Sequence, residues 1–161
     1  MNPRALSLIE QLGLRAHREG GYFREVFRSS SVVTPGPSGA RRTAVTSMYY
    51  LLPAGQVSRL HRVTSDEIWH FLEGDPLELF TIDPSLAALQ THLIGPASNE
   101  ARPLHAVPAH YWQAARPTGA FTLAGCTVGP GFEYEDFTLL ADEPNLRGMI
   151  IQKFPGLAGL L

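Results

Sequence analysis

Hydrophobic and polar residues alternate in short runs along most of the chain, which is the pattern of β-strands with one buried face. Between residues 55 and 131, Gly and Pro turn signals separate these runs about every ten residues. The runs of strand length are 22–28, 43–52, 67–72, 77–82, 89–94, 110–115 and 121–128. Short strands at regular spacing predict a β-sandwich or a β-barrel.

A short amphipathic helix is predicted before the first strand. Asn2 is a suitable N-cap, and Leu6, Ile9 and Leu12 fall on one helical face. Gly13 is a suitable end point for this helix. Because so short a helix is marginally stable alone, we expect its apolar face to pack against a larger body.

The remaining segments complete a single domain over residues 1–161. Asp142 can cap a short C-terminal helix that has Pro144 in its first turn. The Ser-, Pro- and Gly-rich stretch 29–42 predicts an exposed, mobile loop. No internal repeat, low-complexity tract or linker divides the chain, so we expect an all-β domain with short helices at both ends.

Composition excludes several classes of protein. Hydrophobic residues make up 44% of the 161 residues and charged residues 17%, which excludes a disordered chain. The net charge of −2 offers no basic surface for nucleic acid. The single cysteine, Cys126, cannot form an internal disulfide. No apolar run approaches the roughly 20 residues of a membrane helix, and Glu10 interrupts what a signal peptide would need, so we expect a cytoplasmic protein with no membrane contact.

The stretch 55–74 holds the densest set of residues with chemical function. If one strand ends near His61 and the next begins at Glu67, a hairpin brings the two side chains side by side on neighbouring strands. On the second strand, Glu67, Trp69 and Phe71 then share one face. A histidine and a carboxylate on a concave apolar surface can act as an acid–base pair or hold a divalent metal.

The strands predicted to line the barrel add further candidates. An inward tyrosine, Tyr49 or Tyr50, would supply a second proton-transfer group, and we assign this role to Tyr49. Together the candidate aromatic residues would make an apolar pocket with a few polar groups, as in most small-ligand sites. The candidate ligand contacts, some of them anchors for an anionic or sugar-like molecule, are Arg24, Arg59, Trp69, Phe71, Trp112 and Gln113.

The spacing of Gly55, His61, Glu67 and Gly74 resembles the first sequence motif of the cupin superfamily. Val63 stands where that motif has its second histidine. The segment 108–113 resembles the second cupin motif, with Gln113 at the position of its histidine.

Further stretches make the resemblance more specific, and it extends from about Leu6 to Phe154. These stretches are similar to those of a family of uncharacterised single-domain cupins, which is grouped with the epimerase-like jelly rolls of the RmlC-like superfamily. The resemblance implies a double-stranded β-helix, that is, a cupin jelly-roll barrel, forming a homodimer with an open-ended ligand cavity. The matching stretches are 19–25, 46–52, 65–70, 125–132 and 135–137.

Val63 and Gln113 replace two imidazoles of the cupin metal site, and Val cannot ligate a metal. The sequence therefore predicts a pocket with no tightly bound cofactor. A divalent metal held by His61, Glu67 and Gln113 stays as an alternative.

The predicted function is binding of a sugar-derived or other small polar metabolite, with acid–base chemistry at His61. Glu67 would orient His61. The resemblance to epimerase-like cupins implies isomerisation or epimerisation. A non-catalytic metabolite-binding module and a divergent metal-dependent cupin enzyme remain the alternatives.

Overall fold

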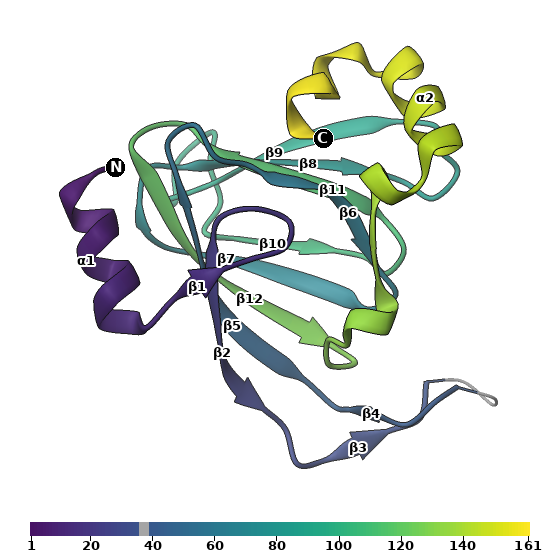
Figure 1. Cartoon of the computed structure of the whole chain (residues 1–161), viewed down its shortest axis with the longest axis horizontal. Helices are drawn as coiled ribbons and strands as arrows, with labels where there is room; N and C mark the ends of the chain where they lie inside the picture. The colour runs from purple at the N-terminus through teal and green to yellow at the C-terminus, as the bar shows by residue number, and fades with distance from the viewer. Residues whose placement is uncertain (36–38) are drawn as a thin grey trace.

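The computed structural model describes residues 1–35 and 39–161, which form two antiparallel sheets packed face to face (Figure 1). The six-stranded sheet has the order β1 (Arg15–Ala16), β2 (Tyr22–Arg28), β5 (Thr46–Pro53), β12 (Phe121–Gly129), β7 (Asp66–Gly74) and β10 (Leu104–Val107). The five-stranded sheet has the order β13 (Phe137–Leu139), β6 (Ser58–Val63), β11 (Trp112–Pro117), β8 (Leu77–Ile82) and β9 (Leu89–Ile94).

From β5 to β13 the chain passes from one sheet to the other at almost every turn. Within this part, only β8 and β9 are consecutive strands that pair with each other. The alternation produces the predicted jelly roll, in which inward side chains of both sheets share one core. That core includes Tyr50, Trp69, Leu79 and Cys126.

The connection between β6 and β7 differs from the prediction. The expected hairpin would pair these strands, but β6 pairs with β11 and β13, whereas β7 pairs with β12 and β10. The short turn between them is a corner that joins the two sheets. Turn residues and alternation are local signals, and sheet membership depends on partners far away in the sequence. His61 and Glu67 therefore lie on opposite sheets instead of on neighbouring strands.

Helix α1 (Pro3–Leu12) begins and ends as predicted. The Asn2 side chain accepts a hydrogen bond from the Arg4 amide at 2.8 Å, and Gly13 adopts a left-handed conformation with φ 61°. The buried face differs from the prediction, because Ala5 and Leu8 are buried and Leu6 is 52% exposed. This face packs against the outer side of the six-stranded sheet.

The C-terminal segment covers the outer side of the five-stranded sheet (Figure 1). It comprises η2 (Leu140–Asp142), α2 (Pro144–Lys153) and η3 (Pro155–Leu160), whereas η1 (Tyr134–Asp136) precedes β13. Asp142 does not cap α2: Glu143 holds the N-cap position without a side-chain hydrogen bond, and Asp142 pairs with Arg18 at 3.3 Å.

Within the stretch 29–42, which was expected to be a loop, β3 (Val32–Val33) pairs with β4 (Arg42–Thr43) in a short ribbon. Residues 36–38 of that expected loop lie outside the described residues. Strands β10 and β13 were not predicted, and both are only three or four residues long. None of the helices in the described chain is both long and apolar enough to span a membrane.

Candidate functional site

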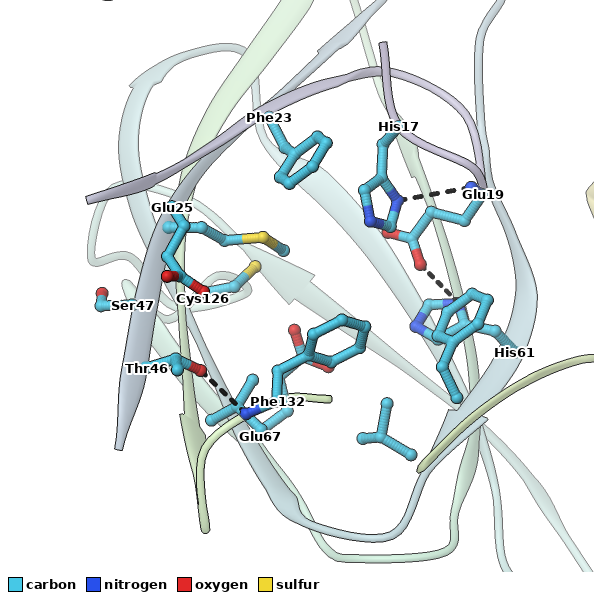
Figure 2. A pocket seen from close by; sticks show the side chains of 14 residues that line it. His17, Glu19, Phe23, Glu25, Thr46, Ser47, His61, Glu67, Cys126 and Phe132 are labelled. Carbon is cyan, nitrogen blue, oxygen red and sulfur yellow. Dashed lines mark hydrogen bonds and ion pairs between the residues drawn. The ribbon is translucent and has the colours of Figure 1, made fainter. Parts of the chain in front are cut away.

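A cavity of about 40 Å³ lies between the two sheets, with room for about three water molecules. Its lining combines aromatic and aliphatic side chains with three carboxylates and two imidazoles (Figure 2). The lining residues are His17, Glu19, Phe23, Glu25, Thr46, Ser47, Met48, His61, Val63, Glu67, Cys126, Val128, Phe132 and Phe137.

Glu19 and His61 form a buried pair at one side of this cavity. Nδ1 of His61 lies 3.1 Å from Oε2 of Glu19 and 2.7 Å from the carbonyl oxygen of Arg59. Because a carbonyl oxygen only accepts hydrogen bonds, Nδ1 carries the proton and donates it. The neutral ring therefore keeps Nε2 unprotonated, with a lone pair for a proton or a ligand.

His17 lies on the other side of Glu19, so the carboxylate sits between two imidazoles (Figure 2). The backbone amide of Glu19 donates to Nδ1 of His17 at 3.3 Å, which leaves that nitrogen unprotonated. Nδ1 of His17 lies 3.7 Å from Oε1 of Glu19. Nδ1–H of His61 donates to the Arg59 carbonyl, and Oε2 of Glu19 lies beside the same nitrogen.

Glu67 is held by a buried chain of hydrogen bonds that joins β7 of the six-stranded sheet to β11 of the five-stranded sheet. Nε1 of Trp69 donates to Oε1 of Gln113 at 3.0 Å, and Nε2 of Gln113 donates to Oε2 of Glu67 at 2.6 Å. The indole N–H can only donate, so it fixes the orientation of the Gln113 amide. Gln113 consequently presents an N–H group to Glu67, and its oxygen is occupied by Trp69.

Burial shifts the pKa values of these groups. It raises the pKa of the Glu19 and Glu67 carboxyls above their ordinary range. It lowers the pKa of His17 and His61, although the nearby Glu19 and Glu67 carboxylates, respectively, oppose this effect. Both imidazoles are therefore neutral at pH 7, and neutral imidazole is the form that accepts a proton.

Aromatic rings enclose the polar groups. The ring of Phe137 stacks on His61, with centroids 5.3 Å apart and an interplanar angle of 28°. The ring of His17 meets Phe23 edge to face at 4.4 Å. These contacts restrict the rotation of both imidazoles, so the histidines are held in place before any ligand binds.

Among the residues predicted to form the site, His61 and Glu67 line the cavity. Gln113 and Trp69 do not line the cavity. Gln113 is hydrogen-bonded to Glu67, and Trp69 is hydrogen-bonded to Gln113. Phe71 is partly buried against the core between the sheets. The alternation predicted for β7 is confirmed, since Glu67 and Trp69 point inward.

Four predicted residues lie away from the cavity. Tyr49 packs with α1 on the outer side of β5, and Trp112 packs under the C-terminal segment on the outer side of β11. Strand alternation places both there, because Tyr50 and Gln113 take the inward positions. Nη1 of Arg24 donates to the carbonyl of Leu12 at 2.9 Å.

Arg59, the fourth, holds the loop that carries Glu19. Its guanidinium donates to the carbonyl oxygens of Arg18 at 2.5 Å and Glu19 at 3.4 Å. The hydroxyl of Tyr50, buried inside the barrel, donates to the carbonyl of Gly20 at 2.8 Å. These residues position the loop, and neither contacts the cavity.

Sequence reasoning missed His17 and Glu19, which come from the loop between β1 and β2. The available signal was the pair Gly20–Gly21, whose φ angles are 115° and 67°. A Cβ atom on Gly20 would lie 2.1 Å from the carbonyl oxygen of Val57. Two glycines that allow such close backbone approach indicate a loop pressed against the barrel.

A metal would find few ligands in this arrangement. Over the described residues, no three His, Cys, Asp or Glu side chains are grouped so that they could hold a metal ion. Val63 lines the cavity but has no atom that could bind a metal. The side-chain nitrogen of Gln113 donates a hydrogen bond to Glu67, and its oxygen accepts one from Trp69, so this oxygen is not directed at a metal beside Glu67.

Comparisons with known proteins give consistent results. Residues 6–140 match the family model Cupin_5, described as Cupin superfamily (DUF985). A solved structure of protein SO0799 from Shewanella oneidensis is 35% identical, with a TM-score of 0.83, and the match covers 96% of this chain and 94% of that one. A hypothetical protein from Leishmania major is 31% identical, with a TM-score of 0.82 and coverage of 97% and 96%. The uncharacterized protein YML079W of Saccharomyces cerevisiae is 29% identical, with coverage of 89% and 78%.

Proposed function

Because the chain belongs to the DUF985 family of the cupin superfamily, we propose that its cavity binds a small polar metabolite and catalyses proton transfer on it. Isomerisation or epimerisation is the reaction class that fits this chemistry. The proposal rests chiefly on one observation, the buried contact between Glu19 and His61.

His61 acts as the base in this proposal. Its Nδ1 proton is donated to the Arg59 carbonyl, with the Glu19 carboxylate beside it, so Nε2 is the nitrogen that takes a proton from the ligand. When His61 becomes an imidazolium, the carboxylate of Glu19 stabilises the charge. The same ring can then return the proton to a neighbouring atom of the ligand, which is the sequence of steps in an isomerisation.

The tyrosine proposed from the sequence as a second proton-transfer group is not needed for this single-base reaction. Tyr49 lies outside the cavity, and the Tyr50 hydroxyl is engaged by Gly20. Glu19 takes the orienting role that the sequence suggested for Glu67, because it is the carboxylate within hydrogen-bond distance of His61.

Deuterium exchange tests the proposal without knowledge of the product. The protein is incubated in D₂O with aldoses, ketoses, their phosphates and nucleotide-linked sugars, and NMR follows exchange of C–H groups next to a carbonyl. Wild-type protein is expected to exchange at least one such position, and His61→Asn to lose the exchange. His70→Asn, on the outward side of β7, is the matched control and should keep it.

Two outcomes would contradict the proposed reaction. Exchange that survives in His61→Asn would exclude His61 as the base. A ligand that raises the unfolding midpoint, with no exchange at any carbon, would favour a metabolite-binding module over an enzyme.

A further inference from the structure

The cavity contains negatively charged groups and no positively charged side chain of its own. Three carboxylates line it, and within the described part of the chain no Lys or Arg does so. Glu25 lies at the rim, where it is 38% exposed and paired with Arg28 at 2.9 Å. Glu19 is shared between two imidazoles. Glu67 is thus the lining carboxylate whose hydrogen-bond partner, Gln113, is a neutral amide.

One hydrogen bond supports an ionised Glu67 carboxylate, but burial opposes the charge more strongly. The side chain is 4% exposed, and the amide of Gln113 is oriented by Trp69 so that its N–H donates to Oε2. A single neutral donor replaces only part of the hydration that a carboxylate loses on burial. A positive charge in the cavity would supply the missing stabilisation.

The walls of the cavity suit such a charge. Phe23, Phe132 and Phe137 line it, and the faces of aromatic rings attract cations. Two arginine side chains that do not line the cavity already lie over two of these rings. The guanidinium carbon of Arg15 lies 5.0 Å from the centroid of Phe23, and that of Arg18 lies 6.0 Å from the centroid of Phe137.

We propose that the ligand of this cavity carries an ammonium group, and that Glu67 anchors it between the aromatic walls. The proposal rests on the proposed function in taking this cavity as the ligand site, and it narrows the substrate class to small amines, including amino sugars. An ammonium group donates three hydrogen bonds, which suits a site rich in acceptors. A volume of about 40 Å³ admits a head group of a few atoms.

The two carboxylates thereby have separate tasks on opposite sheets. Glu19, next to β2, orients the base His61 on β6, and Glu67 on β7 holds the charged end of the ligand. The sequence had suggested Arg24, Arg59 and Gln113 as anchors for an anionic or sugar-like ligand. Both arginines donate to backbone carbonyl oxygens and leave the cavity without an anion site.

Three two-carbon probes of similar size and different charge test the proposal. Ethanolamine, ethylene glycol and glycolate are titrated calorimetrically into the whole protein, with EDTA present to exclude metals. Ethanolamine is expected to bind at least tenfold more tightly than either of the others. In Glu67→Gln, ethanolamine and ethylene glycol should bind equally. Glu73→Gln is the control, because Glu73 lies on the same strand, is partly exposed outside the cavity and pairs with Arg4.

Equal binding of the three probes by wild-type protein would overturn the proposal, as would preference for glycolate. Preference for ethanolamine that persists in Glu67→Gln would overturn the assignment to Glu67. The comparison of the three probes on wild-type protein needs no variant, so it tests the preference for an amine even if Glu67→Gln does not fold. Deuterium exchange on a neutral sugar without amine binding would reject the amine and leave the proton transfer standing. Amine binding without exchange would reject the proton transfer and leave the amine ligand standing.

Discussion

Oε2 of Glu19 lies 3.1 Å from Nδ1 of His61, and this contact joins a glycine-containing loop to strand β6 inside the barrel. Both side chains are about 3% exposed, so the pair is shielded from water. A carboxylate that holds one imidazole nitrogen leaves the other nitrogen to act on a ligand. The proposed reaction depends on this division of roles.

Glu19→Gln is expected to lower the deuterium exchange rate by about 10²-fold, within the range measured for acid–base groups. The amide can still accept the Nδ1 proton, but it cannot neutralise the imidazolium that forms during proton transfer. The exchange rate measured by NMR checks this, with circular dichroism confirming the fold. An unchanged rate would show that Glu19 has only a structural role.

Gly20→Ala is expected to destabilise the protein by about 2 kcal/mol or more, because φ is 115° and the new Cβ meets the Val57 carbonyl. It should also displace Glu19 and lower the exchange rate. Gly148→Ala, in α2 with open space around the new Cβ, is the control and should stabilise by up to about 1 kcal/mol. Urea denaturation measures both, and equal effects of the two substitutions would contradict the close approach.

Gln113→Ala is expected to destabilise the protein by about 2–4 kcal/mol, since it leaves the Trp69 N–H and the Glu67 carboxyl without their partner. Gln90→Ala, at an exposed position of β9, is a matched control with little expected effect. Denaturant titration gives the free energies of unfolding. A loss in Gln113→Ala no larger than in the control would refute the hydrogen-bond chain.

Glu67→Gln is expected to be more stable than wild-type protein at pH 8, because the neutral amide avoids the cost of burying a charge. Burial raises the pKa of Glu67 in the folded state above its ordinary value of 4.5. The folded protein therefore holds this proton more tightly than the unfolded chain, and the penalty for ionisation applies fully above the folded pKa.

The stability difference between Glu67→Gln and wild-type protein should shrink as the pH falls through the folded pKa of Glu67 toward 4.5. Unfolding curves at a series of pH values give this difference directly. A difference that is absent at pH 8, or that grows on acidification, would contradict a raised pKa.

The sequence predicted the parts of this structure that depend on local interactions. The helix α1 follows from Asn2 and Gly13, whose backbone and side-chain preferences act within a few residues. The longer strands of the jelly roll follow from alternation, whereas the short strands β10 and β13 do not, and the inward direction of Glu67 follows from the same pattern.

The remaining features depend on contacts between distant segments. No local signal distinguishes a hairpin from the corner between β6 and β7, so the sequence placed His61 and Glu67 on neighbouring strands. The meeting of Glu19 with His61 joins residues that are 42 positions apart, through a loop held by Arg59. Alternation alone did not decide between Tyr49 and Tyr50, because both register choices leave a tyrosine inside.

Nitrogen-15 NMR of the imidazole of His61 at pH 7 reports directly which ring nitrogen carries the proton, with the signals assigned by their loss in His61→Asn. We expect a neutral ring with the proton on Nδ1 and a free lone pair on Nε2. We also expect Glu19→Gln to perturb the Nδ1 signal. A ring protonated on Nε2 alone, or on both nitrogens, would contradict the role of His61 as the base.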